Sequence, residues 1–166
     1  MPTVSLEPAT YADAVYVARR LRPNDSMEIL PLLHGGAEDL ALSAAGAHYN
    51  RTALNDGKPV AVVGATQIVA TCWQVFMFAT HEWPQVSLSV TRHIVKEMLP
   101  TLYDAGANRA ECRTHADYDY AHRWLEMMGA QREAVIPEYG REAATYYQYV
   151  WLRSCLLYTS PSPRDS

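Results

Sequence analysis

Hydrophobic side chains recur at helical spacing in residues 121–130, AHRWLEMMGA. The apolar residues at positions i, i+3, i+4 and i+7 share one helix face: Ala121, Trp124, Leu125 and Met128. Asp117 is placed to cap the start of this helix, and Gly129 is placed to end it in the left-handed conformation. The apolar and alternating residues on either side predict strands at 109–114 and 131–136, so the pattern indicates a strand–helix–strand unit.

Runs rich in β-branched and aromatic residues predict the other strands. They fall at residues 4–7, 51–54, 59–63, 73–78 and 145–152. Asp56-Gly57 between the second and third of these runs is a hairpin signal. The uncharged run 59–80 is long enough to cross a membrane, but polar residues interrupt it, so it is interpreted as two buried strands joined by a loop. The run 73–78 is the most apolar, which favours a central strand.

Capping signals and apolar stripes predict two helices near the N-terminus. Thr10, with Asp13 three residues later, opens the first, and Pro23 closes it. Its expected buried stripe is Ala14, Val17, Ala18 and Leu21. Asp25 and Glu28 repeat the capping pattern for a short second segment.

Two further helices are expected. The first is marked by Ala37, Leu40, Ala41 and Ala44 and is stopped by Gly46. The second is a long helix from about residue 86, in which Pro100 should cause a kink or end the regular part. Its expected inward residues are Thr91, Ile94, Val95, Met98 and Leu102.

Composition limits the class of protein. A chain of 166 residues with 49% hydrophobic residues suits one compact domain, which we place at residues 1–154. The net charge of −4 argues against a nucleic-acid partner, which would require a basic face, and no membrane partner is expected. Cys72 and Cys112 lie in apolar strand contexts, so we expect buried thiols with no disulfide framework and no metal site.

The last residues do not resemble part of a fold. Residues 155–165, CLLYTSPSPRD, are identical to the translation of a common sequencing adapter in one reading frame. We therefore interpret 155–166 as an artefactual tail, and its Pro and Ser content predicts disorder.

The strand–helix–strand unit resembles the C-terminal half of the GNAT superfamily, the acyl-CoA-dependent N-acetyltransferases. The usual pattern there is Asn-x-x-Ala-x-Arg-x-Tyr-Glu-x-x-Gly-Phe. The matching residues are Ala121, Arg123, Glu126 and Gly129. Tyr118 stands in place of the Asn, Leu125 in place of the Tyr that often serves as general acid, and Ala130 in place of the Phe. The order of elements also matches, and the resemblance implies an α/β GNAT-like fold with a mixed central sheet and helices on both faces.

A second resemblance rests on four phrases taken together. They are LRPNDSMEI at 21–29, DGKPVAVVG at 56–64, RWLEMMGA at 123–130 and EYG at 138–140. The combination resembles small GNAT-like proteins of short-tailed bacteriophages, some of which are internal virion components. This resemblance implies a location in the host cytoplasm or packaging in the virion, with phage virion or host proteins as partners.

The GNAT resemblance implies that acetyl-CoA is the cosubstrate. Its pantetheine arm would pair with the central strand at Val75, Phe76, Met77 and Phe78. The family's phosphate loop, Arg/Gln-x-x-Gly-x-Gly/Ala, is replaced by residues 80–85, THEWPQ, which contain no glycine. The residues that could substitute at the start of the next helix are Ser87, Ser89, Thr91 and Arg92.

Acetyl transfer to an amine also requires a base that removes the ammonium proton. The catalytic candidates are Glu28, His81 and His115. Arg22 and Asp25 lie where relatives shape the acceptor site, so we expect them to bind substrate. The plainer alternatives are a helix-capping pair for Asp25 and Glu28, and solvated loop histidines for His81 and His115.

Two functions remain open at this point. One is a phage-encoded N-acetyltransferase that moves acetyl from acetyl-CoA to an unknown small-molecule or protein amine. The other is a GNAT-fold virion or host-interaction protein that has lost CoA binding, which the glycine-free loop and Leu125 favour.

Overall fold

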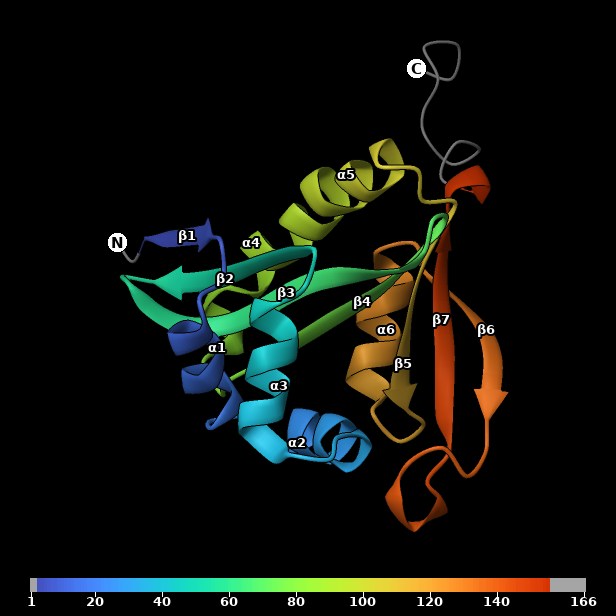
Figure 1. The fold of residues 1–166 in the computed structure, drawn as a ribbon, viewed down its shortest axis with the longest axis horizontal. Helices are drawn as coiled ribbons and strands as arrows, with labels where there is room; N and C mark the ends of the chain where they lie inside the picture. Colours follow the sequence, from blue (N-terminus) through green and yellow to red (C-terminus); the bar gives the residue numbers. More distant parts are fainter. Residues whose placement is uncertain (1–2, 156–166) are drawn as a thin grey trace.

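A mixed seven-stranded sheet organises the computed structural model, which describes residues 3–155. The strands are β1 (Val4–Glu7), β2 (Tyr49–Asn55), β3 (Lys58–Val69), β4 (Cys72–Ala79), β5 (Arg109–His115), β6 (Gln131–Ile136) and β7 (Tyr146–Leu152). Their order in the sheet is β1-β2-β3-β4-β5-β7-β6. Every neighbouring pair is antiparallel except β4 and β5, which are parallel and lie in the middle of the sheet (Figure 1).

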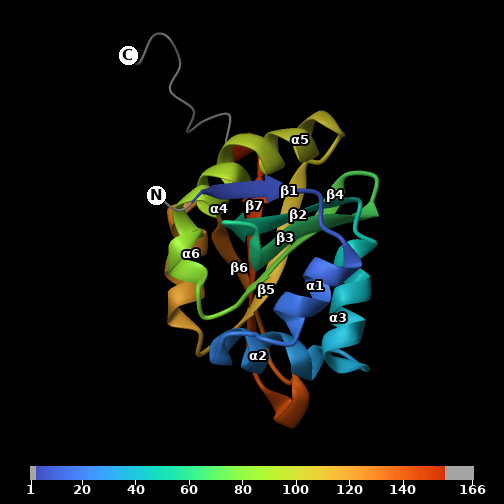
Figure 2. The same ribbon diagram turned by 90° about the vertical axis from the view of Figure 1, so that its left-hand side faces the viewer.

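Helices cover both faces of this sheet, as the GNAT resemblance implies. On one face lie α1 (Tyr11–Ala18) and α3 (Gly36–Ala45), which pack on Val62 and Phe78. On the other lie α4 (Ser87–His93), α5 (Leu99–Asp104) and α6 (Asp119–Met127), with the larger core cluster beneath them. The short helix α2 (Pro23–Ile29) belongs to neither layer and lies across one end of the sheet (Figure 2). Single 3-10 turns occur at Leu30–Leu32, Trp83–Gln85 and Arg141–Ala143.

Several local predictions are confirmed. Thr10 caps α1 by accepting the Asp13 N–H at 3.1 Å. Asp56 and Gly57 both have positive φ, which is the conformation that a tight two-residue hairpin turn requires. Gly129 follows the end of α6 and has a φ of 97°, which is the left-handed conformation predicted for it. The uncharged run forms β3 and β4, and β4 is the central strand of the seven.

The structure corrects the helix boundaries near the N-terminus. α1 ends at Ala18, so Leu21 lies outside it, and Pro23 begins α2 instead of closing α1. A proline suits that first helical position because its missing N–H would have no partner there. The capping role predicted for Asp25 and Glu28 is wrong, because the N-cap residue is Arg22 and no side chain caps α2.

The long helix is irregular where its proline predicts a disturbance. A π-helical segment, Ile94–Met98, joins α4 to α5, and Pro100 follows within the first turn of α5. Proline removes one backbone bond and its ring crowds the preceding turn, which accounts for the widened turn. Ile94, Met98 and Leu102 face the core as expected, whereas Val95 is 39% exposed.

The helix α6 begins later than its predicted cap. Tyr118 is the N-cap residue, and the carboxylate of Asp117 does not cap the helix. Leu125 and Met128 are buried in the larger core cluster, and Trp124 packs against that cluster while staying partly exposed.

No helix within residues 3–155 is both long enough and apolar enough to cross a bilayer. In the same residues, no group of three or more His, Cys, Asp or Glu side chains is placed to hold a metal ion. Nearly all of the predicted artefactual tail, residues 156–166, lies outside the described residues.

The burial of Leu125 gives a direct test of the register of α6. Replacing Leu125, which is 5% exposed, with Ala should lower the free energy of unfolding by about 3 kcal/mol, because it leaves a cavity in the core. Met127→Ala is the matched control, since Met127 is 69% exposed on the same helix and should change stability by less than about 0.5 kcal/mol. Chemical denaturation measures both. Equal effects would show that the helix is rotated from the position described.

Candidate active site

The parallel strands β4 and β5 separate after only three partner pairs. These pairs are Cys72 with Arg109, Trp73 with Ala110, and Gln74 with Glu111. Beyond them, β4 stays with β3 as far as Ala79, and β5 stays with β7 as far as His115. The two halves of the sheet therefore open into a wedge, which we call the splay (Figure 1).

The splay leaves part of the β4 backbone without a strand partner. The Thr80 N–H donates to the Val60 carbonyl on the β3 side at 2.9 Å. Because successive residues of a strand alternate the side on which their backbone groups point, Val75, Met77 and Ala79 present theirs toward the splay. Met77 lies beyond the last β4–β5 pair, so its N–H and C=O face the opening with no strand beside them.

Helix α2 spans the open end of the splay and touches both of its edges. On the β4 side, Asp25 Oδ2 accepts the Ala79 N–H at 2.8 Å, and the Arg22 N–H donates to the Ala79 carbonyl at 2.9 Å. On the β5 side, Glu28 Oε2 accepts the His115 N–H at 3.2 Å. Residues three apart on one helix thus hold the two strand ends at a fixed separation.

The Asp25 carboxylate is fully engaged and only 2% exposed. Its oxygens accept bonds from the Arg22 guanidinium at 2.8–3.1 Å and from the Tyr118 hydroxyl at 2.9 Å, in addition to the Ala79 N–H. Burial raises the pKa of Asp25, and the bonds from Arg22, Ala79 and Tyr118 oppose that rise. With every oxygen occupied, Asp25 anchors α2 and has little capacity left for a ligand.

Glu28 is held in a different way. Burial in the first place, and the neighbouring Asp25 charge in the second, raise its pKa to about 8. Among the described residues only Oε2 has a hydrogen-bond donor, and Oε1 is not among the fully buried atoms that lack a partner, so Oε1 keeps some exposed surface. The Tyr146 hydroxyl donates to the Glu28 carbonyl and fixes this turn of α2 on β7. The result is a positioned carboxyl group that exchanges a proton near neutral pH.

A cavity of about 750 Å³ passes through the splay. On the α6 side its walls include Tyr120, Trp124, Leu125 and Met128. On the α2 and α3 side they include Ile29, Leu32, Leu33, Leu42 and Phe76. Glu28 also lines this cavity, whose walls come from elements on both faces of the sheet. This volume lies within the range of small-molecule and cofactor sites.

The segment between β4 and α4 does not form a phosphate cradle. Most of its N–H groups are bonded within the segment: Glu82 to the Thr80 hydroxyl, Trp83 to the Thr80 carbonyl, Gln85 to the Glu82 carbonyl, and Val86 to the Trp83 carbonyl. A cradle requires several backbone N–H groups that converge on the anion. The residues present fit the extended arm of acetyl-CoA along Met77 and offer its pyrophosphate no loop of that kind.

Aromatic side chains also join this segment to α6. Trp83 Nε1 donates to the Tyr120 hydroxyl at 2.9 Å, and the Trp83 and Trp124 rings meet edge to face with centroids 5.4 Å apart. Trp124 Nε1 donates to the Thr91 hydroxyl on α4 at 2.8 Å. We call Trp83, Thr91, Tyr120 and Trp124 the aromatic seam. It closes the gap between α4 and α6 beside the splay.

The structure gathers only some of the predicted site residues at this cavity. Arg22, Asp25 and Glu28 line it together with Val75, Phe76, Met77 and Phe78. His115 contributes its backbone N–H to Glu28, whereas its imidazole accepts the Asp117 N–H and packs on Tyr146 beside a second hollow of about 550 Å³.

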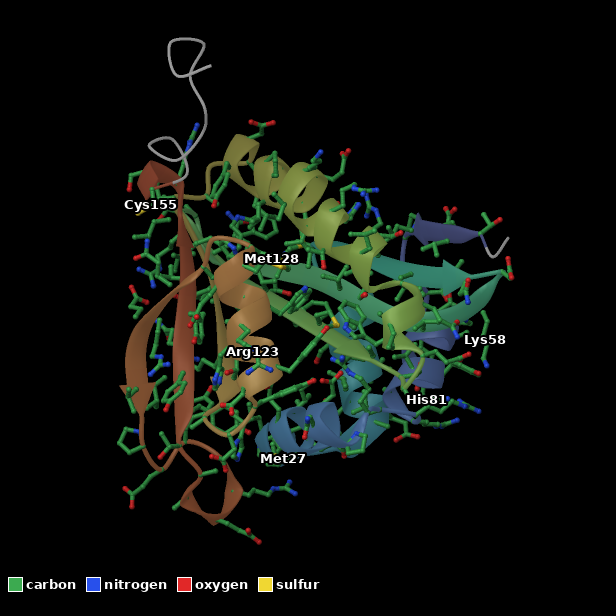
Figure 3. The ribbon with its side chains drawn as sticks, turned by 180° about the vertical axis from the view of Figure 1, so that it is seen from behind. Met27, Lys58, His81, Arg123, Met128 and Cys155 are labelled. Carbon is green, nitrogen blue, oxygen red and sulfur yellow. The ribbon has the colours of Figure 1, made fainter. Side chains whose placement is uncertain are left out.

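The other predicted residues lie outside the cavity lining. His81 is exposed on the loop after β4, near Lys58 and away from α6 (Figure 3). Ser87, Ser89 and Arg92 lie on α4, where Arg92 is exposed. Their predicted roles in catalysis and phosphate binding stay predictions.

Three tyrosines at the site were not predicted from the sequence. Tyr118 binds Asp25, Tyr120 lines the cavity beside Trp83, and Tyr146 binds the Glu28 carbonyl. Tyr118 stands at the Asn position of the family pattern. The pattern gave its position in the chain but did not indicate its hydrogen bond to Asp25. The other contacts join residues far apart in the chain, and no local pattern reveals them.

Structural comparison shows that acetyltransferases of known structure share this fold. No protein-family model matches the sequence, and no curated protein matches it. Solved structures match over nearly the whole chain. The chain has the GNAT acetyltransferase fold.

Three of the matched structures illustrate the likeness. Ard1 from Thermoplasma volcanium has a TM-score of 0.71 and 13% identity, with 90% of this chain and 97% of that chain covered. The putative acetyltransferase yncA from Salmonella typhimurium, solved with its cofactor acetyl-CoA, has a TM-score of 0.68 and 10% identity, with 90% and 93% covered. Aminoglycoside acetyltransferase AAC(6')-Ib, in complex with coenzyme A and kanamycin, has a TM-score of 0.65 and 13% identity, with 95% and 99% covered.

The raised pKa of Glu28 predicts how stability depends on pH. Between about pH 4.5 and 8 the unfolded chain ionises this carboxyl while the folded chain keeps it protonated, so the free energy of unfolding should fall as the pH rises through that window. Glu28→Gln removes this contribution. The stability difference between parent and variant, measured by denaturation at several pH values, should therefore change in favour of the variant as the pH rises. Parallel curves would show that Glu28 ionises normally.

Proposed function

We propose that this chain is an N-acyltransferase that moves an acyl group from a pantetheine thioester such as acetyl-CoA to a primary amine, with Glu28 as the general base. The observation that carries the proposal is the free oxygen of Glu28 at the open end of the splay. A base whose pKa lies near the working pH is the most effective in proton transfer, and the pKa of Glu28 is raised to about 8.

The backbone of β4 supports the donor side of the proposal. Met77 offers one donor and one acceptor to an extended amide-containing arm, in the way that a neighbouring strand would use them. For the phosphates, we propose the residues predicted from the sequence, Ser87, Ser89 and Arg92 on α4. When bound, acetyl-CoA would supply the acyl group as an activated thioester.

Glu28 Oε1 takes the proton from the substrate ammonium, which frees the nitrogen lone pair to attack the thioester carbonyl carbon. The C–N bond forms, the nitrogen of the adduct releases its second proton to solvent, the C–S bond breaks, and the sulfur leaves with the electron pair as a thiolate. Leu125 stands where the family Tyr would return a proton to that sulfur. Tyr120 also lines the cavity. Its hydroxyl accepts from Trp83 and donates to no described residue, so its proton is available for this step.

The activity should follow the ionised form of Glu28. With acetyl-CoA and an amine substrate, kcat/KM should rise with pH through about 8, because only the carboxylate accepts a proton. Glu28→Gln should lower kcat/KM by about a hundredfold or more. Glu97→Gln, which changes an exposed carboxylate on the π-helical segment, should leave it unchanged. Full activity in Glu28→Gln would exclude Glu28 as the base.

Binding of acetyl-CoA tests the donor side separately. Arg92→Glu should weaken binding several-fold, and more at low than at high salt, because salt screens an exposed charge contact. Lys96→Glu makes the same charge change one turn further along and should have a smaller effect. Calorimetric titration measures both variants. Binding tighter than micromolar that Arg92→Glu does not affect would mean that the phosphates lie elsewhere.

A second candidate function rests on the aromatic seam and on the bonded N–H groups of the segment after β4. These features favour a GNAT-fold protein that has lost CoA binding and acts as a virion or host-interaction protein of a short-tailed bacteriophage. The four sequence phrases that resemble such phage proteins support that setting for either function. If the parent chain shows no binding at millimolar acetyl-CoA, the enzyme proposal is wrong and the interaction protein remains.

A further inference from the structure

The side of the cavity next to α2 and α3 has an apolar wall. It is formed by Ile29, Leu32, Leu33, Leu42 and Phe76, which we call the aliphatic wall. Gly64 lets the Phe76 ring lie close to β3, because a Cβ at Gly64 would come within 2.7 Å of that ring. Leu32 is 38% exposed and Leu42 is 63% exposed at the rim. Covering exposed apolar side chains with an apolar ligand removes their surface from water, which favours binding.

Charge on the cavity walls is nearly balanced. Among the described residues that line it, the charged ones are Arg22, Asp25, Glu28 and Arg113. Arg22 and Asp25 neutralise each other in a buried ion pair. Arg113 donates to Gln148 Oε1 at 3.1 Å and to the Tyr139 hydroxyl at 3.2 Å, so it is positioned by neutral groups and keeps its positive charge. Glu28 is therefore the only acid on the walls that is left to face a cationic ligand.

We propose that the acceptor is a primary amine carried on an apolar or aromatic group, with the amine at Glu28 and the apolar group against the aliphatic wall. This inference rests on the proposed function and specifies its substrate class. A polyamine or an aminoglycoside would bring several positive charges to walls that offer one free carboxyl group and an arginine. The free-energy cost of burying those charges without partners exceeds the favourable free energy of the contacts that such a ligand makes.

The test compares amines that differ in the group attached to nitrogen. With acetyl-CoA as donor, kcat/KM for 2-phenylethylamine should exceed that for spermidine by about tenfold or more, because the phenyl group is buried against the wall. Peptides beginning with Phe and with Lys extend the comparison. A preference for the Phe peptide over free 2-phenylethylamine would identify a protein N-terminus as the source of the amine, and the reverse order would identify a small molecule.

Leu32→Asp tests the wall itself. Because Leu32 is partly exposed, the variant should fold with a similar melting temperature. It should raise KM for 2-phenylethylamine about tenfold and leave or lower KM for spermidine, since it adds a carboxylate and removes apolar contact. Val135→Asp on β6 is the control, because Val135 is also an exposed aliphatic side chain, at 58% against 38% for Leu32, but lies outside the cavity lining. It should change neither KM.

Direct titration of the parent chain with 2-phenylethylamine separates the two proposals. Binding that Leu32→Asp weakens, without turnover of any amine, would support the apolar acceptor site and overturn acyl transfer. Turnover in which spermidine equals or exceeds 2-phenylethylamine would overturn the acceptor class and leave acyl transfer standing. Neither binding nor turnover would overturn both.

Discussion

The early separation of β4 from β5 is the constraint on which the rest of this structure depends. Three paired residues hold the two halves of the sheet together, and beyond them each strand follows a different neighbour. Separation exposes backbone groups that would otherwise be bonded, and buried polar backbone groups must find partners. Met77 keeps its groups open to a cavity, whereas Ala79 is satisfied by Arg22 and Asp25. The cavity, the free strand edge and the position of α2 all follow from this opening.

Helix α2 keeps the opening at a fixed width and creates the chemistry at its end. Asp25 and Glu28 hold opposite edges of the splay, and because they are three residues apart on α2 their carboxyl groups lie near each other, with Asp25 buried and Glu28 partly buried. Asp25 has Arg22 and Tyr118 to stabilise its charge, while Glu28 has a single backbone donor. Two carboxyl groups that share a site do not ionise equally, and the less stabilised one holds its proton to a higher pH. The same arrangement therefore fastens α2 and prepares Glu28 to exchange a proton.

The sequence predicts most of the fold because its signals are local. Period-two strands, the Asp56-Gly57 turn and the Thr10 cap depend on neighbours within a few residues. The site is less predictable because its contacts join distant segments. Asp25 and Glu28 look like a capping pair from their spacing, yet their partners are Ala79 and His115, which only the folded sheet brings near. Tyr120 and Trp83 meet for the same reason.

The central claim is that the free edge of β4 receives the donor, and amide hydrogen exchange at Met77 tests it most directly. Without ligand, the Met77 N–H faces the splay with no strand beside it and should exchange readily. Saturating acetyl-CoA should slow exchange at Met77, while amides already bonded between β3 and β4 should change little. Unchanged exchange at Met77 under millimolar acetyl-CoA, or protection confined to other strands, would contradict the account.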